Sequence, residues 1–473
     1  MRISLSGRDQ QVGGTESQER EDRMSNAASY FVFWNCLRRI LRPEHNAKWW
    51  YSTVHIVTAM VGAGVLSLPS TMVYLGWAPG MMMLGVSWII TLATMYQMIE
   101  MHEDESGRHD TYQCLGRKAF GDRLGNLIVG SQQIVVQVTA NIAYLVTGGQ
   151  ALKRFGDLVL NREIQYGKFE LAVAWISAFA GVQAVLSLFA SFSSMTIVSL
   201  MASIMSFSYS TIVWATAIRL KSSQASYGYC NLTYYRAFNA LGEIAFAYGG
   251  HNVALEIQAT MRSTRHKPSK LPMWNGVLVA YVMVAVCYFP VAGVGYWALG
   301  NLTCYENVLD VLDKPKWLIG TANLMLMLHL TGSYQVFALP IYDALTCWLE
   351  QKKLPINAWI RPLYVGFTCL VAVIIPSFAG LLGLFGGLAL GPTTYFLPCI
   401  MWLSIKKPRV LGLEWLLNWA CILFGVVLTI VSAIGSIVNL KHGFEEQNLK
   451  VFYFPRLQQC NSTSTNASCP VRH

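Results

Sequence analysis

Charged residues are scarce in this chain. Asp, Glu, Lys and Arg make up 13% of its 473 residues, whereas an ordinary globular protein holds about 25%. Hydrophobic residues make up 54% of the chain. So few charges beside so much apolar surface exclude a set of soluble domains, and they predict an all-α polytopic membrane protein.

Three further patterns are missing. The 11 cysteines include no CxxC pair and no Cys/His ligand spacing, so we expect no metal and no cofactor. The formal charge of +10 does not arise from a basic cluster interleaved with aromatic residues, so we expect no nucleic-acid partner. Residues 1–35 lack the ordered charged, apolar and cleavage regions of a secretory signal peptide, so none is predicted.

Eleven apolar runs are each long enough to cross a bilayer, which takes about 20 residues. They cover residues 49–73, 77–99, 126–149, 169–189, 195–218, 237–260, 274–299, 317–343, 359–378, 381–403 and 413–438. The tenth run is rich in glycine, so it could contain an irregular turn. We expect residues 1–48 to form a polar tail, residues 49–438 the membrane domain and residues 439–473 a second tail.

The loops between these runs indicate the orientation in the lipid bilayer. Cytoplasmic loops are enriched in Lys and Arg, and the bias modestly favours a cytoplasmic N-terminus and an extracellular C-terminus. Glycosylation acceptors require an extracellular or lumenal loop, and they give the same orientation. The sites are Asn231, Asn301, Asn461 and Asn466. Cys460 and Cys469 lie on that oxidising side and could pair.

The first run is interrupted near its middle. Val61-Gly62-Ala63-Gly64-Val65 places two glycines where a plain anchor would stay helical, and Pro69 follows. Broken backbone inside a bilayer survives only where protein buries it or a water-filled cavity receives it. Secondary transporters hold their substrate between such half-helices. A seam of small residues for helix packing is the alternative.

The sixth run carries a second break at the corresponding place. Phe246-Ala247-Tyr248-Gly249-Gly250-His251-Asn252 puts a glycine pair in mid-span. The second set of five runs starts from the opposite side of the membrane, so the topology is that of inverted five-helix repeats with broken helices 1 and 6. Two matched breaks favour a transporter over a packing seam.

Strings around both breaks resemble the lysine–histidine transporter group of the plant amino acid/auxin permease family. They are NAKWWYS (46–52), TAMVGAGVL (58–66), FAY (246–248), GHNV (250–253), LEIQAT (255–260), KPSK (267–270), CYFPV (287–291) and GPTTYFLPC (391–399). The likeness runs from about residue 46 to residue 454. It implies a multi-pass plasma-membrane protein that takes up amino acids with protons, on the fold of the sodium-coupled leucine carrier.

Two stretches depart from the pattern of that group. The group usually continues with GLPYA after the first break, where this chain has Ser67-Leu68-Pro69-Ser70-Thr71. The usual QQLIVE of the third run corresponds to residues 132–137, with Gln137 in place of the acid. The first departure bears on the substrate range, and the second bears on the coupling chemistry.

An amino acid zwitterion needs donors for its carboxylate and acceptors for its ammonium. The helix that resumes after the first break offers unpaired N–H groups, and the half-helix that ends at the second break offers carbonyls. The expected substrate-binding residues are Val61, Gly62, Ala63, Gly64, Val65, Phe246, Ala247, Tyr248, Gly249, Gly250 and Asn252. Backbone contacts read only the shared head group, so we expect broad specificity and leave the preferred amino acid open.

Two titratable residues are candidates for proton coupling. His251 has an ordinary pKa of about 6.5, between an acidic exterior and a neutral cytosol, although a neutral histidine could simply bond the broken backbone. Glu243 is a candidate because carboxylates inside a span are costly and usually functional. Glu256 lies near the cytoplasmic end, where we expect it to pair with Arg262 or Arg265.

The remaining polar residues within the spans are lesser candidates. A lone polar side chain in a membrane helix often only bonds a neighbouring helix. These lesser candidates are His55, Asn141, Tyr144, Asn323 and His329.

Two other functions remain open from the sequence. A sensor would bind amino acids at the same site without moving them. A membrane acyltransferase would also bury a histidine with an asparagine, as in His251-Asn252 or Asn323 with His329. No acyl-donor tunnel or nucleophile can be identified, and the paired breaks would be unexplained. We therefore predict a transporter rather than an enzyme.

Overall fold

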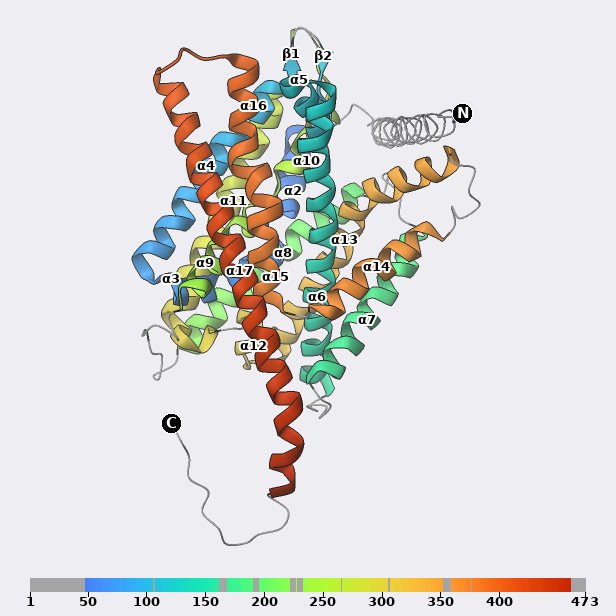
Figure 1. Ribbon diagram of the computed structural model, residues 1–473, viewed down its shortest axis with the longest axis vertical. Coiled ribbons are helices and arrows are strands. Elements are labelled where there is room, and N and C mark those ends of the chain that lie inside the picture. Colours follow the sequence, from blue (N-terminus) through green and yellow to red (C-terminus); the bar gives the residue numbers. More distant parts are fainter. Residues whose placement is uncertain are drawn as a thin grey trace, which may run out of the picture.

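The computed structural model describes residues 47–104, 107–160, 168–189, 195–221, 227, 233–264, 266–304, 307–351, 359–375 and 377–460. Helices dominate these residues, and most of the long ones run along the longest axis of the molecule (Figure 1). The strands of the described part are β1 (Glu103–Asp104) and β2 (Gly107–Arg108), which pair antiparallel. The predicted all-α fold class is confirmed.

Helical segments coincide with every one of the expected runs. The first run forms α2 (Trp49–Met60), η1 (Ala63–Ser67) and α3 (Leu68–Leu75), and the sixth forms α9 (Tyr234–Ala247) and α10 (His251–Ala259). The other runs form α4 (Trp77–Met101), η2 (Gly125–Gly130) with α6 (Ser131–Leu160), α7 (Lys168–Ser187), α8 (Met195–Arg219), α11 (Lys270–Leu299), α13 (Lys316–Gln351), α14 (Ile360–Ile374), α15 (Phe378–Phe385) to α16 (Leu397–Lys406), and α17 (Leu413–Cys460).

Six described helical stretches are individually long and apolar enough to cross a membrane. They are Trp77–Met101, Val198–Arg219, Lys270–Thr303, Lys316–Glu350, Phe378–Lys406 and Leu413–Gly443. The pair Trp49–Met60 and Ala63–Leu75, bent by 48°, makes a seventh span when counted as one. The expected total of eleven stays a prediction, because the other runs form helices that do not meet this measure alone.

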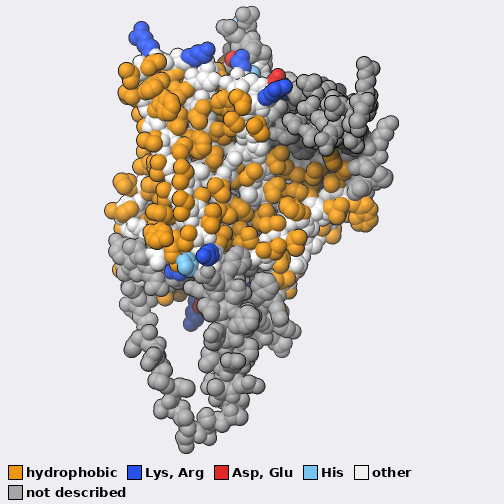
Figure 2. All heavy atoms as spheres, viewed as in Figure 1, with side chains coloured by type: hydrophobic (Ala, Val, Ile, Leu, Met, Phe, Trp, Pro, Cys, Tyr) orange, Lys and Arg blue, Asp and Glu red, His pale blue; other side chains and the backbone are white. Residues whose placement is uncertain are grey.

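The outer surface fits a surrounding of lipid. Figure 2 shows hydrophobic side chains over the middle of one face, with Lys and Arg near its two ends. Large apolar side chains such as Ile89, Val282 and Leu423 are more than half exposed. A soluble protein rarely exposes so wide an apolar surface, and a band of this kind suits contact with lipid.

Both expected breaks are present. After α2 ends at Met60, the chain passes through Gly62, whose φ of -124° and ψ of -136° are neither helical nor β, and resumes as the 3₁₀-helix η1, which leads into α3 with Pro69 in its first turn. Proline is tolerated there because the first turn needs no intrahelical N–H bond. The tenth run is also irregular, since η5 (Gly386–Leu390) and η6 (Pro392–Phe396) are π-helical.

Three shorter elements and one extension complete the described chain. Helix α5 (Tyr112–Leu124) follows the β1–β2 hairpin, while η4 (Gly300–Thr303) and α12 (Val308–Val311) connect α11 to α13. Helix α17 continues to Cys460, beyond the expected end at residue 438, because helix-forming residues follow its apolar run directly.

Loop contacts hold the C-terminal end of α10. Arg108 of β2 donates to the carbonyls of Gln258, Ala259 and Met261 at 3.3 to 3.4 Å. The Ala47 amide donates to the Thr260 carbonyl at 3.2 Å. A cation at a helix C-terminus satisfies carbonyls that have no partner within the helix. The segment before α2 is therefore tied to the end of α10.

Candidate functional site

The two breaks lie against each other at the centre of the helix bundle. A β-carbon on Gly64 would lie 2.8 Å from the Cα of Ala247, and one on Gly250 would lie 2.9 Å from the Cγ of Met60. Carbon atoms do not approach that closely without displacement, so Gly64 permits the contact with the Ala247 backbone and Gly250 the contact with the Met60 side chain. The close approach places the ends of four half-helices, α2, η1–α3, α9 and α10, around one point.

Tyr288 of α11 joins the carbonyl ends of two of these half-helices. Its hydroxyl lies 2.6 Å from the Met60 carbonyl oxygen at the end of α2 and 2.5 Å from the Ala247 carbonyl oxygen at the end of α9. A tyrosine hydroxyl carries one hydrogen, so it can donate fully to only one of them at a time. Tyr288 thus connects the first break to the second.

Side chains of α8 satisfy the other carbonyls of the first break. Ser206 Oγ donates to the Val61 carbonyl at 2.8 Å, and the Tyr209 hydroxyl lies 3.1 Å from the Gly62 carbonyl. His329 of α13 stands behind them, with Nδ1 3.0 Å from Ser206 Oγ and 3.1 Å from the Ala202 carbonyl. Buried carbonyls need such partners, so His329 supports the broken backbone indirectly.

The N-terminal ends of the resumed helices offer donors instead. The caps of η1 and α10 are Gly62 and Gly250, and neither has a side-chain cap. The first N–H groups of a helix have no partner within it, and the helix dipole adds positive potential there. Both ends can therefore receive an anion.

A small cavity lies between these ends. It is lined by Ala59, Met60, Gly62, Ala63, Gly64, Ala140, Tyr144, Phe246, Gly249, Asn252, Phe337 and Leu390. The volume of the cavity is about 20 Å³. This volume suits one or two water molecules and not an amino acid. The site is closed in this conformation, and a larger ligand requires side chains or half-helices to move.

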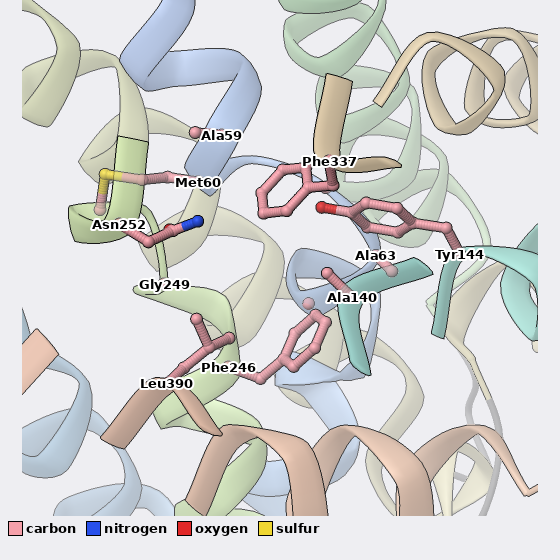
Figure 3. A pocket seen from close by; sticks show the side chains of 12 residues that line it. Ala59, Met60, Ala63, Ala140, Tyr144, Phe246, Gly249, Asn252, Phe337 and Leu390 are labelled. Carbon is pink, nitrogen blue, oxygen red and sulfur yellow. The ribbon is translucent and has the colours of Figure 1, made fainter. Parts of the chain in front are cut away.

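Two polar side chains point into the cavity from opposite sides (Figure 3). The amide of Asn252, which is 1% exposed, has no hydrogen-bond partner in the described part of the chain at either Nδ2 or Oδ1. The ring of Tyr144 packs edge-on against Phe337, with centroids 5.6 Å apart. A buried amide without partners is costly, so Asn252 is poised to bond a ligand.

Most of the expected substrate residues are brought together, although not all line the cavity. Gly62, Ala63, Gly64, Phe246, Gly249 and Asn252 line it, as does Tyr144. Val61, Val65, Ala247, Tyr248 and Gly250 are buried beside it and do not line it. The lining residues missed from the sequence are Ala59, Met60, Ala140, Phe337 and Leu390. They are ordinary apolar residues of spans, so no local signal distinguishes them.

His251 turns away from the cavity toward α4. Its Nε2 lies 3.1 Å from the Thr91 carbonyl and 3.0 Å from Thr94 Oγ1. A carbonyl only accepts, so Nε2 carries the hydrogen of a neutral ring. Nδ1 has no partner among the described residues.

Glu243 is fully buried on α9, one turn before Phe246. Its Oε1 accepts a hydrogen bond from Asn239 Nδ2 at 2.7 Å. Its Oε2 has no partner, and no cation pairs with the carboxyl in the part of the chain that the structure describes. A buried carboxylate without a cation is strongly disfavoured, so this group favours binding a proton.

The lesser candidates mainly bond neighbouring backbone or helices. Asn141 donates to the Tyr364 hydroxyl at 3.0 Å, and Asn323 donates to the Ile319 carbonyl of its own helix at 2.9 Å. The His55 ring contacts the Tyr51 ring with centroids 4.1 Å apart and the planes tilted by 48°. These contacts are those of polar residues that hold membrane helices together.

Glu256 does not form the expected ion pair. Its Oε1 accepts from Gln133 Nε2 of α6 at 3.0 Å, and among the described residues no lysine or arginine pairs with it. The expected pair with Arg262 does not form, because α10 carries Glu256 toward α6 rather than toward the loop after α10. Arg265, the other expected partner, lies outside the described residues.

Comparisons with known proteins identify the family of this chain. A family model described as transmembrane amino acid transporter protein matches residues 45–438. Lysine histidine transporter-like 1 of Arabidopsis thaliana is 51% identical over 408 residues, covering 84% of this chain and 89% of that protein. Lysine histidine transporter-like 6 is 48% identical, and amino acid permease 1 is 28% identical, both also from Arabidopsis thaliana.

Among solved structures, a Na⁺-coupled sialic acid symporter in a substrate-bound outward-open state superposes with a TM-score of 0.48 at 9% identity, covering 87% of this chain and 97% of that one. The sequence matches settle the family, and they confirm both the predicted resemblance and the prediction that the chain is not an enzyme. The protein belongs to the transmembrane amino acid transporter family and is a multi-pass transporter of amino acids.

Proposed function

We propose that this protein imports amino acids by proton symport, with broad specificity for the side chain. The observation that carries the proposal is the pair of uncapped helix N-termini beside the unpartnered amide of Asn252 at one buried cavity. Helix N-termini bind carboxylates, and every amino acid substrate has one. Because these donors recognise the shared head group, different side chains can use the same site.

The apolar part of the cavity is suited to the side chain of the substrate. Ala140, Phe337 and Leu390 lie on its wall beyond the broken backbone. An apolar wall discriminates weakly between side chains that differ by a methylene group, by about 1–3 kcal/mol. Broad specificity follows from this arrangement, with exclusion mainly by size.

The ammonium group would meet carbonyls of the breaks or the Asn252 Oδ1. The Ala247 carbonyl, which the sequence suggested as an acceptor, already lies against Tyr288. An ammonium that approached it would compete with the Tyr288 hydroxyl, which can keep its bond to Met60. The two acceptors of Tyr288 would let substrate bind without leaving that hydroxyl unpaired.

Protons are supported as the coupling ion over sodium. Sodium in a broken-helix site uses oxygen ligands such as exposed carbonyls. The Met60, Val61 and Gly62 carbonyls of the first break already accept hydrogen bonds from Tyr288, Ser206 and Tyr209. Glu243 and His251 are the titratable groups next to the breaks, and either could carry a proton.

We further propose a plasma-membrane location with a cytoplasmic N-terminus and an extracellular C-terminus. The sequon at Asn301 lies in η4, and Cys304, three residues later, is disulfide-bonded. Disulfides form in oxidising compartments, which supports an outer position for this loop. Asn231, Asn461 and Asn466 lie outside the described residues. Asn301→Gln should remove a glycan-sized mass, whereas detection of an N-terminal tag on intact cells would overturn the orientation.

Uptake into proteoliposomes tests the transport mechanism. With the interior at about pH 7.5, an external shift from about pH 7.5 to 5.5, across the ordinary histidine range, should increase concentrative uptake of a labelled neutral amino acid. Uptake should persist when potassium replaces sodium, and unlabelled amino acids of several side-chain types should compete. A requirement for sodium would refute proton symport. Binding without any exchange of label would instead identify a sensor.

A further inference from the structure

A carboxyl group and an amide meet beside the cavity, on the side of the bundle where the segment before α2 lies. They belong to Glu256 of α10 and Gln133 of α6, which are hydrogen-bonded to each other. They bear on how a substrate leaves the cavity, so their role rests on the proposed import of amino acids.

Helical spacing places Glu256 just beyond the cavity on α10. Asn252, whose side chain points into the cavity (Figure 3), precedes Glu256 by four residues on this helix. Side chains four residues apart lie on the same face of a helix, about 6 Å apart along its axis. The end of α10 that follows Glu256 is tied to Ala47 through the Thr260 carbonyl. In the proposed orientation this end is cytoplasmic.

Helix α6 places Gln133 on the same side of the cavity. Ala140 lines the cavity, and Gln133 precedes it by seven residues, which is two turns along the same face and about 10 Å. The start of α6 lies on the cytoplasmic side, since η2 and α5 connect it to the hairpin whose Arg108 holds the end of α10. Gln133 and Glu256 therefore lie between the cavity and the cytoplasm.

The neighbouring Gln132 anchors this part of α6. Its Nε2 donates to the carbonyls of Leu388 and Ala389, both at 2.8 Å. These carbonyls belong to the π-helical segment η5, whose Leu390 lines the cavity. The start of α6 is thus fixed to one wall of the cavity, which holds Gln133 in place beside α10.

The contact between Gln133 and Glu256 leaves acceptors without donors. Gln133 Nε2 donates to Glu256 Oε1 at 3.0 Å. Gln133 is 2% exposed, and its Oε1 has no hydrogen-bond partner among the residues that the structure describes. No lysine or arginine in the same part of the chain pairs with the half-buried Glu256. A buried amide oxygen without a donor and a carboxylate without a cation are both costly.

The surrounding elements do not supply the missing positive charge. The elements packed against α10 include α2, α4 and η6, which contain no lysine or arginine. The basic residues of α5 are exposed or form ion pairs with aspartates. Arg108 bonds the carbonyls at the end of α10, and Lys153 and Arg154 lie toward the other end of α6. A bound cation is therefore the partner that suits this pair of acceptors.

We propose that Glu256 and Gln133 form a second ammonium site, which receives the amino group of the substrate as it passes from the cavity to the cytoplasm. An ammonium donates three hydrogen bonds, so it can bond Glu256 Oε2 and Gln133 Oε1 while Gln133 Nε2 keeps its bond to Oε1. The opposite charges attract strongly because bulk water is largely excluded. The amino group thereby exchanges the neutral acceptors of the cavity for a charged one further along α10.

Transport measured from each face of the membrane tests this site. Right-side-out vesicles present the outer face to a labelled amino acid, and inside-out vesicles present the cytoplasmic face. Glu256→Gln keeps the shape of the side chain and removes its charge. We expect its KM from the cytoplasmic face to rise at least about tenfold, with the KM from the outer face within about twofold of the unmodified protein.

Two further variants serve as controls for Glu256→Gln. Glu256→Asp keeps the charge, so it should recover most of the affinity from the cytoplasmic face. Glu100→Gln removes a carboxylate from a partly exposed ion pair with Lys270, and it should change neither KM.

Gln133→Lys tests the site independently, including the case in which Glu256→Gln does not reach the membrane. A lysine at this position places a tethered ammonium beside Glu256, where it should compete with the amino group of the substrate. The KM from the cytoplasmic face should again rise about tenfold or more, and the KM from the outer face should not change.

Three results would overturn the proposed ammonium site. One is an unchanged cytoplasmic KM in both Glu256→Gln and Gln133→Lys. Another is a loss of pH-dependent uptake in Glu256→Gln with both KM values unchanged, which would assign Glu256 to the coupled proton. The third is a cytoplasmic KM that depends on internal sodium or potassium only while Glu256 is present, which would assign the site to an inorganic cation. Unmodified protein that binds amino acids without uptake would instead refute the proposed import.

Discussion

The Cα of Ala247 lies 2.8 Å from the position that a β-carbon of Gly64 would take. Gly62, two residues earlier in the same motif, has 3.6 Å between that position and Nε2 of His329, which is an ordinary contact. The two glycines of the first break therefore have different roles. Gly64 permits contact with the second break, whereas Gly62 allows the backbone to leave the helix.

This difference predicts unequal effects of the smallest substitution. Gly64→Ala should reduce uptake at least about a hundredfold at equal surface expression, because the methyl group must displace backbone rather than a flexible side chain. Gly62→Ala, the matched control, should retain most of its uptake. Initial rates in transport-deficient cells, corrected for surface protein, measure both. Equal rates for the two variants would contradict the predicted contact between the breaks.

Removing the hydroxyl of Tyr288 should destabilise the protein and slow transport. Tyr288→Phe removes the side-chain donor that the Met60 and Ala247 carbonyls share. The Met60 carbonyl keeps the Gly62 amide at 3.0 Å, whereas the Ala247 carbonyl loses its side-chain partner, and a buried unpaired group costs about 1–3 kcal/mol. Tyr281→Phe is the control, since the Tyr281 hydroxyl is buried without a hydrogen-bond partner in the described part of the chain. Thermal unfolding in detergent should show a lower Tm for Tyr288→Phe and an unchanged or higher Tm for Tyr281→Phe. A Tm loss of the same size in both variants would argue against a special role for Tyr288.

Asn252 should contribute to substrate binding and not to the stability of the fold. Its amide bonds nothing in the described protein, so Asn252→Ala should leave the Tm unchanged or raise it slightly. The KM for amino acid uptake should rise about tenfold or more, as expected for one lost hydrogen bond to a charged group. Asn141→Ala provides the contrast, because Asn141 bonds Tyr364 and its loss should lower the Tm. An unchanged KM in Asn252→Ala would show that the amino acid head group binds elsewhere.

Glu103, in the hairpin that follows α4, should make stability depend on pH. Burial alone would raise the pKa of Glu103, but the nearby His102 ring, 3.6 Å from Oε1, and hydrogen bonds from Ser269 and Ser263 together lower it to about 2. A carboxyl whose pKa is lower when folded stabilises the protein above its ordinary pKa of about 4.3. This contribution is lost as the pH falls toward about 2.

Glu103→Gln should therefore lower the Tm at pH 7. The difference from the unmodified protein should shrink steadily below about pH 4.3, the ordinary value for glutamate. Thermal unfolding between pH 7 and pH 3 measures it, with Glu100→Gln as the control at a more exposed ion pair. A Tm difference that stays constant across this range would show that the hydrogen bonds do not depend on ionisation of Glu103.

Much of the backbone could be predicted from the sequence. The apolar runs and the interruptions at Gly62-Ala63-Gly64 and Gly249-Gly250 depend on residues next to each other in the chain, and each run coincides with helix. The extension of α17 to Cys460 was missed, because a membrane boundary does not end a helix whose sequence continues to favour one. The pairing of Glu256 was wrong because it depended on which helix lies beside α10.

The sequence by itself determined that the spans exist, that two of them are broken, and that the breaks offer the donors and acceptors an amino acid needs. These properties follow from local preference: glycine and proline interrupt a helix, and broken backbone requires burial or water. Only the tertiary structure decided that Phe337 and Leu390 share a wall with Asn252, that Tyr288 joins Met60 to Ala247, and that His251 bonds Thr91 and Thr94 of α4. Those partners lie far apart in the chain, and packing between helices selects them by shape, which no short stretch of sequence encodes.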